Sequence, residues 1–266
     1  MLRSVFAKVL HDQWRVLLGW TVVAGIFAAF YLSLYPSIGA VDEMQKLFDS
    51  MPPALRAMFA AEGVDISTPA GYLNVELFTF VVPLLVFAVT LTAGGGATAG
   101  EEERGTLELL LANPIARWRL VLEKFVAMTG LGAAVAAGIW LALAITARVA
   151  GIDLALDRVA GALVSAWLLG IAMGALTMAI GSLTGNRMLS IGVTLAIVVL
   201  GFFINALGPL VEALKPWRIV SPHYHYIGYD PLANGLDMAH AAVLLLMTTI
   251  FVVLAVVIFE RRDLRG

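Results

Sequence analysis

Residues 100–119 read GEEERGTLELLLANPIARWR and place four acidic side chains and three arginines between two long apolar runs. Elsewhere the chain is strongly apolar, since 61% of its 266 residues are hydrophobic and 14% are charged. A soluble domain carries about 25% charged residues. The composition therefore indicates an integral membrane protein, and the charged stretch marks a loop outside the membrane.

Apolar runs of about 20 residues, the length that a helix needs to cross a bilayer, repeat on both sides of this loop. They predict a single all-α integral membrane domain over residues 1–266 with six transmembrane helices. The predicted spans are 16–36, 77–99, 125–147, 159–183, 188–207 and 239–259, with the charged loop at 100–120 between spans two and three.

The segments between the spans carry their own signals. Residues 1–15 repeat apolar positions with helical period, which predicts an N-terminal amphipathic helix lying in the membrane interface. Residues 41–51 and 54–61 predict two short helices separated by the Pro52-Pro53 pair. Residues 208–237 predict an external cap of short or re-entrant helices between spans five and six.

Glycines occur at the spacing that lets helices approach closely. Gly96 and Gly100 are four residues apart, as are Gly170 and Gly174. This spacing is typical of helix–helix contacts in membranes. The run 94–96 is compatible with a hinge as well as with close packing, and we favour packing.

Lysines and arginines orient the predicted spans. Six spans put both termini on one side, together with the 100–120 loop and the 184–187 turn, and eleven of the 17 basic residues fall on that side. Because basic residues concentrate on the cytoplasmic side of membrane proteins, both termini and the charged loop are predicted to be cytoplasmic.

The sequence offers no energy source of its own. A phosphate-binding loop needs a lysine directly after a glycine, and none of the four lysines follows one. The interiors of the predicted spans lack Asp, Glu, Lys, Arg and His, which disfavours an ion-coupled carrier. An ATP-independent carrier or channel is nevertheless the alternative to a transporter powered by another protein. The net charge of −2 excludes the basic footprint of a nucleic-acid-binding protein.

Two polar features outside the loop need an interpretation. We expect His223 and His225 to lie on an extended segment, where they could hold a metal, but no acid or thiol completes a ligand set. We therefore predict no metal, and a membrane enzyme built on these histidines is disfavoured. Asn205, in the fifth span, is the candidate for a residue of the substrate pathway, although we favour an interhelix hydrogen bond as its role.

The charged loop itself is predicted to be helical. Glu101, Arg104 and Glu108 then lie along one face, while residues 107, 110 and 111 give a leucine stripe on another. Pro114 ends this helix. A solvated loop would explain the charges but not the leucines, so a docking helix is favoured.

The motif is also specific. Residues 101–117 match the pattern E-E-x-x-G-T-x-E-x-L-L-x-x-P-x-x-R and so resemble the signature of ABC-2 type transporter permeases. Residues 221–226 resemble the family's S-P-F-x-Y-Y segment, and residues 259–264 its terminal F-x-R-R-D-L. The resemblance covers nearly the whole chain. It implies a permease of an exporter in a bacterial or archaeal cell membrane, without ATPase activity and with no cofactor of its own.

The resemblance also implies partners and site residues. ATP and Mg²⁺ would bind separate ATPase subunits, and the permease would form a homodimer within membrane lipid and contact no nucleic acid. The cargo would be lipophilic or amphipathic, such as a drug, a lipid or a peptide. The 184–187 turn would add a second, smaller contact to the coupling helix. The residues implied to make or brace the ATPase contact are Glu101, Glu102, Glu103, Arg104, Thr106, Glu108, Arg117, Asn186 and Arg187.

Overall fold

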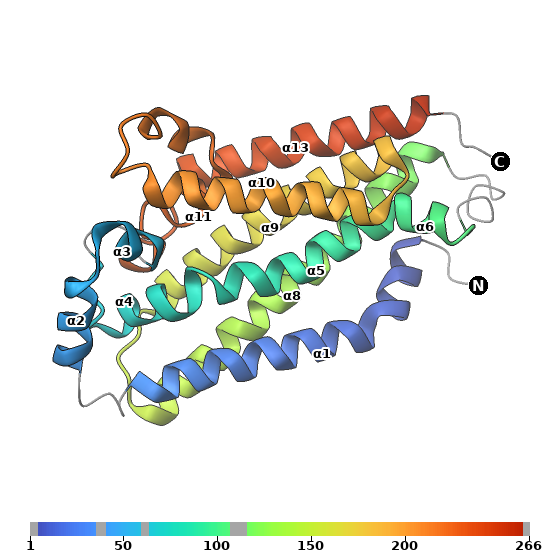
Figure 1. Ribbon diagram of the computed structural model, residues 1–266. Coiled ribbons are helices and arrows are strands. Elements are labelled where there is room, and N and C mark those ends of the chain that lie inside the picture. Colours follow the sequence, from blue (N-terminus) through green and yellow to red (C-terminus); the bar gives the residue numbers. More distant parts are fainter. Residues whose placement is uncertain (1–4, 36–40, 60–63, 107–115, 263–266) are drawn as a thin grey trace.

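The computed structural model describes residues 5–35, 41–59, 64–106 and 116–262, and this part of the chain contains helices and no strand (Figure 1). The predicted all-α class is confirmed. The helices are α1 (Val5–Leu34), α2 (Val41–Ser50), α3 (Pro53–Phe59), α4 (Pro69–Leu73), η2 (Asn74–Phe78), α5 (Val81–Ala97), α6 (Ala99–Glu103), α8 (Arg117–Ala150), α9 (Leu156–Thr184), α10 (Arg187–Leu207), η3 (Lys215–Val220), α11 (Pro222–Ile227), α12 (Pro231–Asn234) and α13 (Met238–Arg261).

Four helices in the described part are long and apolar enough to cross a membrane, namely α8, α9, α10 and α13. A fifth crossing arises if the bent pair Pro69–Phe78 and Val81–Ala97, with 41° between its halves, acts as one span. The protein is therefore a multi-pass membrane protein. The sixth span would be α1, whose described apolar stretch Leu18–Leu34 has 17 residues and lies at the short end of the range for a span. The six-span count stays a prediction.

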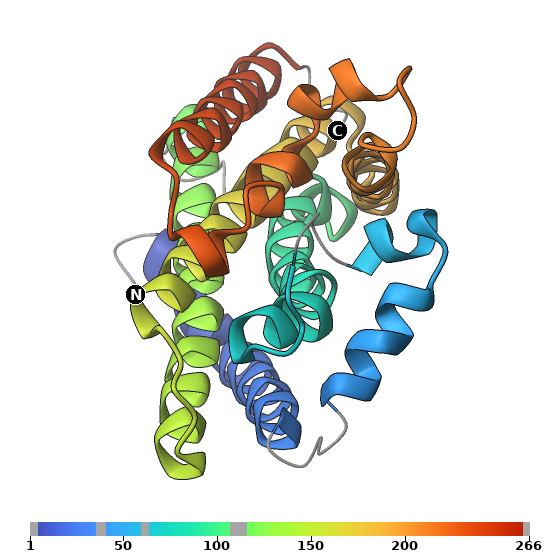
Figure 2. The same cartoon turned by 90° about the vertical axis from the view of Figure 1, so that its left-hand side faces the viewer.

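The long helices run side by side, and the two ends of the bundle differ (Figure 1). The start of α1, the end of α13 and α6 lie at one end, while α2, α3, α4 and α11 lie at the other. Figure 2 looks along the bundle from this second end and shows α1 and α13 on opposite sides of it. α6 and both terminal helix ends thus share one end of the bundle, as a common side for the charged loop and the termini requires.

α1 is one continuous helix across the predicted boundary between an interfacial helix and a first span. Figure 1 shows its first turns bent away from the axis of the rest. The side chains of residues 5–17 lie outside the described part, so the interfacial role of residues 1–15 stays a prediction. The two short helices predicted around Pro52-Pro53 are present as α2 and α3.

α9 is the central helix, and its close contact with α5 depends on glycine. A Cβ on Gly94 would clash with the carbonyl oxygen of Gly174, so the two backbones touch here. Gly170 faces α5 as well, against Val86. The other predicted pair, Gly96 and Gly100, does not form such a contact at Gly96, because a Cβ on Gly96 would meet nothing within 4 Å. The predicted close packing is confirmed for Gly170 and Gly174 of α9. On α5, the glycine that contacts α9 is Gly94 rather than Gly96.

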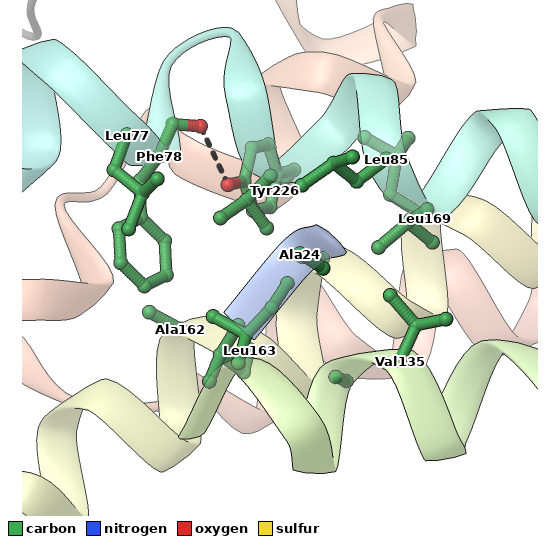
Figure 3. Close-up of a cluster of buried hydrophobic side chains, with 14 of the residues drawn as sticks. Ala24, Leu77, Phe78, Leu85, Val135, Ala162, Leu163, Leu169 and Tyr226 are labelled. Carbon is green, nitrogen blue, oxygen red and sulfur yellow. Dashed lines mark hydrogen bonds between the residues drawn. The ribbon is translucent and has the colours of Figure 1, made fainter. Parts of the chain in front are cut away.

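The second predicted span begins earlier than residue 77 and is broken. Helical residues start at Pro69, and η2 forms a π-helical turn before α5 begins at Val81. A π-turn loosens the backbone ladder, and freed carbonyls need other donors in an apolar setting. Tyr226 supplies one of them, since its hydroxyl donates to the Phe78 oxygen at 2.7 Å (Figure 3). Thr79 supplies another, to the Asn74 oxygen at 2.8 Å.

Candidate functional site

α6 is a five-residue helix in which three consecutive glutamates bind three different helices. Successive residues of a helix point about 100° apart, so Glu101, Glu102 and Glu103 leave α6 in different directions. Their partners belong to α8, to the end of α13 and to the start of α10, respectively. A short helix with few contacts of its own is thereby fixed to much of the bundle.

Glu101 lies at the centre of a compact ionic cluster. Its Oε1 accepts from Lys124 Nζ of α8 at 2.6 Å and lies 3.3 Å from Arg104 Nη2. Its Oε2 accepts from the hydroxyl of Thr106. Burial alone would raise the pKa of Glu101, but the hydrogen bonds from Lys124 and Thr106 and the two neighbouring cations outweigh it, so the pKa is lowered. Glu101 is therefore held as a carboxylate.

Glu102 forms a two-pronged ion pair with Arg262, the residue that follows α13. Arg262 Nη2 donates to Oε1 at 2.8 Å and Nη1 to Oε2 at 3.0 Å. Arg262 Nη1 also donates to the Ser182 oxygen on α9 at 3.2 Å. The side chains are only 24% and 21% exposed, and paired charge-assisted bonds of this form are among the strongest in proteins. This contact joins α6 to α13 and α9.

Arg117, the first residue of α8, adds to the same junction from the other side. Its Nη1 donates to the Arg262 oxygen at 2.8 Å and to the Phe259 oxygen at 3.4 Å. Carbonyls at a helix C-terminus lack partners within the helix, and a basic side chain there satisfies them and complements the helix dipole. Arg117 therefore caps α13 and ties it to α8.

Glu103 and Asn186 together cap the start of α10. Glu103 Oε1 accepts from the backbone N–H of Arg187 at 2.7 Å, and Asn186 Oδ1 accepts from that of Leu189 at 2.8 Å. Free N–H groups at a helix N-terminus favour an acidic side chain by hydrogen bonding and by the helix dipole. The 184–187 turn, predicted as a separate minor contact, is thus joined to α6.

Other side chains at this end face outward. The side chains of Arg104 and Arg119 are 54% and 58% exposed, and Trp118 is 47% exposed. Glu108 and the leucine stripe at residues 107, 110 and 111 lie outside the described residues. Of the predicted docking residues, the three glutamates of α6 and Arg117 bind within the chain, whereas Arg104 is exposed. Trp118 and Arg119 belong to the same exposed set but were not predicted.

Sequence reasoning missed the inward partners Lys124, Ser182 and Arg262. Lys124 could have been suspected, since it is the single lysine between residues 100 and 214 and follows directly after the charged loop. Arg262 stands 160 positions from Glu102, and neither residue carries a local sign of the other.

Asn205 is used at the opposite end of the bundle. Its Oδ1 accepts a long hydrogen bond of 3.5 Å from Arg218 Nη2 of η3. This contact connects a long helix with the predicted cap, and it is of the interhelix kind that we favoured over a substrate contact. The described cap consists of η3, α11 and α12.

The histidines differ from their predicted arrangement. His223 and His225 lie on the helix α11 rather than on an extended segment, and the fold brings His240 to His225 with 3.0 Å between their Nδ1 atoms. His225 Nε2 lies 2.8 Å from the Ile219 oxygen, so it carries the proton and donates, and its Nδ1 accepts from His240. Within the described residues no group of three or more His, Cys, Asp or Glu side chains could hold a metal.

His223 is buried between rings. Its centroid lies 5.3 Å from that of Phe202 and 5.5 Å from that of Tyr226, both edge-on. Neither ring nitrogen has a hydrogen-bond partner in the described part of the chain. Burial lowers the pKa of His223 to about 4, so the ring is neutral at physiological pH.

Two comparisons with known proteins bear on this arrangement. A family model described as ABC-2 family transporter protein matches residues 4–264. A search of curated proteins finds no match. The family match spans the whole bundle, including both ends described above.

Proposed function

Because the chain belongs to the ABC-2 transporter family, we propose that it is the permease of an exporter driven by ATP that a separate subunit hydrolyses. Members of this family are membrane subunits of ABC transporters and typically pair with ATPase subunits. The membrane location and the transport role follow from the family. Export, the cargo and the residues that couple hydrolysis to movement are parts of the proposal.

The observation that carries the coupling role is the distribution of partners around α6. Glu101, Glu102 and Glu103 connect this helix to α8, α13 and α10, with ionic or charge-assisted bonds of 2.6–3.0 Å. A force applied to the 100–120 loop would therefore act on several long helices together. Coupling travels through such rigid, contiguous contacts, and a solvated loop would not transmit it.

The surface offered to the ATPase is the exposed set beside these bonds. Arg104, Trp118 and Arg119 combine two cations with an aromatic ring, and arginine and tryptophan are the residue types that most often dominate binding energy in interfaces. Asn186 lies exposed on the neighbouring turn. The glutamates would brace this surface from behind rather than contact the partner.

The exposed apolar faces support a homodimer in a bilayer. In the apolar stretches of α10 and α13 only 17% and 22% of the residues are buried within one chain. Membrane lipid and a second copy of the permease would cover the remainder. The cargo is proposed to be lipophilic or amphipathic, and the membrane to be that of a bacterial or archaeal cell.

Cross-linking to the ATPase tests the proposal directly, because the chain has no cysteine of its own. Arg104→Cys would carry a photoactivatable cross-linker in the full permease co-expressed with a candidate ABC ATPase. Trp217→Cys is the matched control, as it is 59% exposed at the opposite end. We expect adducts from position 104 and none from position 217, together with transport that requires ATP. Adducts from position 217 alone, or transport without the ATPase, would overturn the proposal in favour of the carrier alternative.

A further inference from the structure

A cavity of about 370 Å³ opens beside the glutamate cluster. One of its walls is the stretch of α5 from Ala88 to Ala97, and Trp20, Met128 and Leu131 line it from α1 and α8. The charged groups of Glu101, Arg104, Lys124 and Arg187 lie at the α6 end. Its size falls in the range of about 300–1,000 Å³ that is typical of small-molecule sites.

The α6 end of this cavity carries an excess of positive charge. Three of its four charged lining residues are cations, and the single anion, Glu101, already accepts from Lys124 and Thr106. Apolar walls strengthen the field of such charges because they exclude water. The cavity therefore favours an anion at this end.

Arg187 is the cation of the cavity lining that takes no part in the Glu101 cluster. A Cβ added to Gly95 or Gly100 would lie 3.3–3.4 Å from its aliphatic stem, so the stem crosses the junction of α5 and α6. Its Nε is buried and has no hydrogen-bond partner among the described residues. A buried donor left without an acceptor is destabilising, and an anionic ligand would relieve this.

The rest of the cavity is suited to hydrocarbon. Ala88 and Ala97 are nine residues apart, which corresponds to about 14 Å along a helix. Between them the wall is made by small side chains, and Trp20, Met128 and Leu131 face it. The site is therefore polar at one end and apolar along its length.

We propose that this cavity binds an anionic amphiphile, with its phosphate or carboxylate headgroup at Arg187, Arg104 and Lys124 and its hydrocarbon chain along α5. A resident bilayer lipid and a transported cargo share this chemistry. The second source rests on the proposed export function, whereas binding itself does not.

Gly96 provides a way to fill the cavity without disturbing the packing. It lines the cavity, and an added Cβ would meet nothing within 4 Å. Gly96→Leu therefore extends into the site, while leucine also favours the helix over glycine. Gly130→Leu is the matched control, since Gly130 is also helical and open to an added side chain but does not line the cavity.

The experiment measures binding of labelled phosphatidylglycerol to the full permease in nanodiscs of phosphatidylcholine, without ATPase or nucleotide. We expect Gly96→Leu to weaken binding at least tenfold and Gly130→Leu to leave it unchanged. Arg187→Gln should reduce the preference for phosphatidylglycerol over phosphatidylcholine about tenfold, while Arg261→Gln, an exposed cation at the same end of the bundle and outside the cavity, should not. Wild-type binding in Gly96→Leu, or an unchanged preference in Arg187→Gln, would overturn the proposal.

A second arm separates the two sources of the ligand. The permease with its ATPase and ATP would be compared with the same complex without ATP. A cargo leaves the nanodisc leaflet only with ATP, and Gly96→Leu abolishes this movement, whereas a resident lipid stays bound in both conditions. Because the first arm contains no ATPase, failure of lipid binding and failure of ATP-driven export are distinguishable.

Discussion

The two ends of the bundle differ in how their polar side chains are bonded. At the α6 end, ionised side chains pair with one another, as Glu101 does with Lys124 and Glu102 with Arg262. At the α11 end, neutral groups hydrogen-bond to backbone carbonyls or to one another, as Tyr226 does to Phe78 and His225 to His240. Among the described residues, the partly buried ion pairs lie at the α6 end, whereas the ion pair at the other end, between Arg56 and Asp49, is exposed.

This difference fits the roles that we assign to the two ends. Ion pairs at the edge of the membrane join separate helices and still leave cations exposed for a partner. Neutral hydrogen bonds satisfy broken backbone such as η2 without placing charge close to hydrocarbon. The α6 end should therefore respond to charge reversal, and the α11 end to loss of single hydrogen bonds and to protonation.

The largest expected effect comes from reversing one charge at the α6 end. Glu102→Arg replaces the carboxylate that lies 2.8–3.0 Å from the Arg262 guanidinium by a second cation and leaves both cations without a counter-ion. We expect a loss of about 3 kcal/mol in stability and the loss of ATP-driven transport. Thermal unfolding in detergent and transport in proteoliposomes measure these effects. Asp49→Arg, on the exposed pair with Arg56 at the opposite end of the bundle, is the control and should change stability by less than about 1 kcal/mol.

Lowering the pH should destabilise the α11 end, because His223 is buried there in its neutral form. The pKa of His223 is about 4 in the folded protein against an ordinary value of 6.5, so below pH 6.5 the unfolded chain binds a proton that the folded chain does not. The contribution of neutral His223 to the free energy of unfolding is fully present above pH 6.5. It is lost as the pH falls toward 4, by about 3 kcal/mol in total.

His223→Phe tests this window, because phenylalanine can keep the edge-on ring contacts with Phe202 and Tyr226 and does not titrate. We expect its melting temperature to fall less than that of the wild type between pH 6.5 and pH 4.5. Glu101 acts in a lower window, since its pKa is below its ordinary value of 4.5 and its contribution disappears only as the pH falls through that lowered pKa. Parallel curves for wild type and His223→Phe would contradict this assignment.

A single hydrogen bond supports the break before α5. Tyr226→Phe removes the donor to the Phe78 oxygen at 2.7 Å and leaves a buried carbonyl unpaired. We expect a loss of about 1–3 kcal/mol, measured by thermal unfolding. Tyr224→Phe on the same helix is the control, and an equal loss there would mean that the bond to Phe78 has no special role.

The smallest effect on stability should come from the exposed set. Arg104→Gln removes an ion pair whose arginine is 54% exposed, and such pairs contribute about 0–1 kcal/mol. We expect near wild-type melting but weaker ATPase binding, measured by co-purification at increasing salt. Unchanged retention of the ATPase would remove Arg104 from the docking surface.

The sequence predicted those features that depend on local pattern. Composition predicted the all-helical membrane class, and the Pro52-Pro53 pair separated α2 from α3 as expected. The spacing of Gly170 and Gly174 predicted a close helix contact, which the fold places against α5. Periodicity and backbone chemistry are sufficient for such features.

Features that depend on distant partners were not predictable. The break at η2 is satisfied by Tyr226, 148 residues away, and the pairing of His225 with His240 requires the fold of the cap. The charged loop was recognised as important, but the direction of each glutamate was not, because a helix model of residues 101–108 places Glu101 and Glu108 on a common face and contains no information on α8 or α13. The single helix predicted from residue 101 to Pro114 is wrong at its start, because α6 ends at Glu103 and Gly105 has a left-handed backbone with φ of 66°. Residues 107–115 lie outside the described part of the chain, so the helical form of the leucine stripe stays a prediction.

The central claim is that α6 transmits force to the bundle through its ion pairs, and exchanging the charges of Glu102 and Arg262 tests it most directly. ATP-driven transport would be measured in proteoliposomes for Glu102→Arg, Arg262→Glu and the double variant. We predict that each single variant loses transport and that the double variant, in which the pair is restored in reverse, recovers a substantial part of it. Transport at wild-type level in either single variant, or a double variant no better than the singles, would contradict the claim.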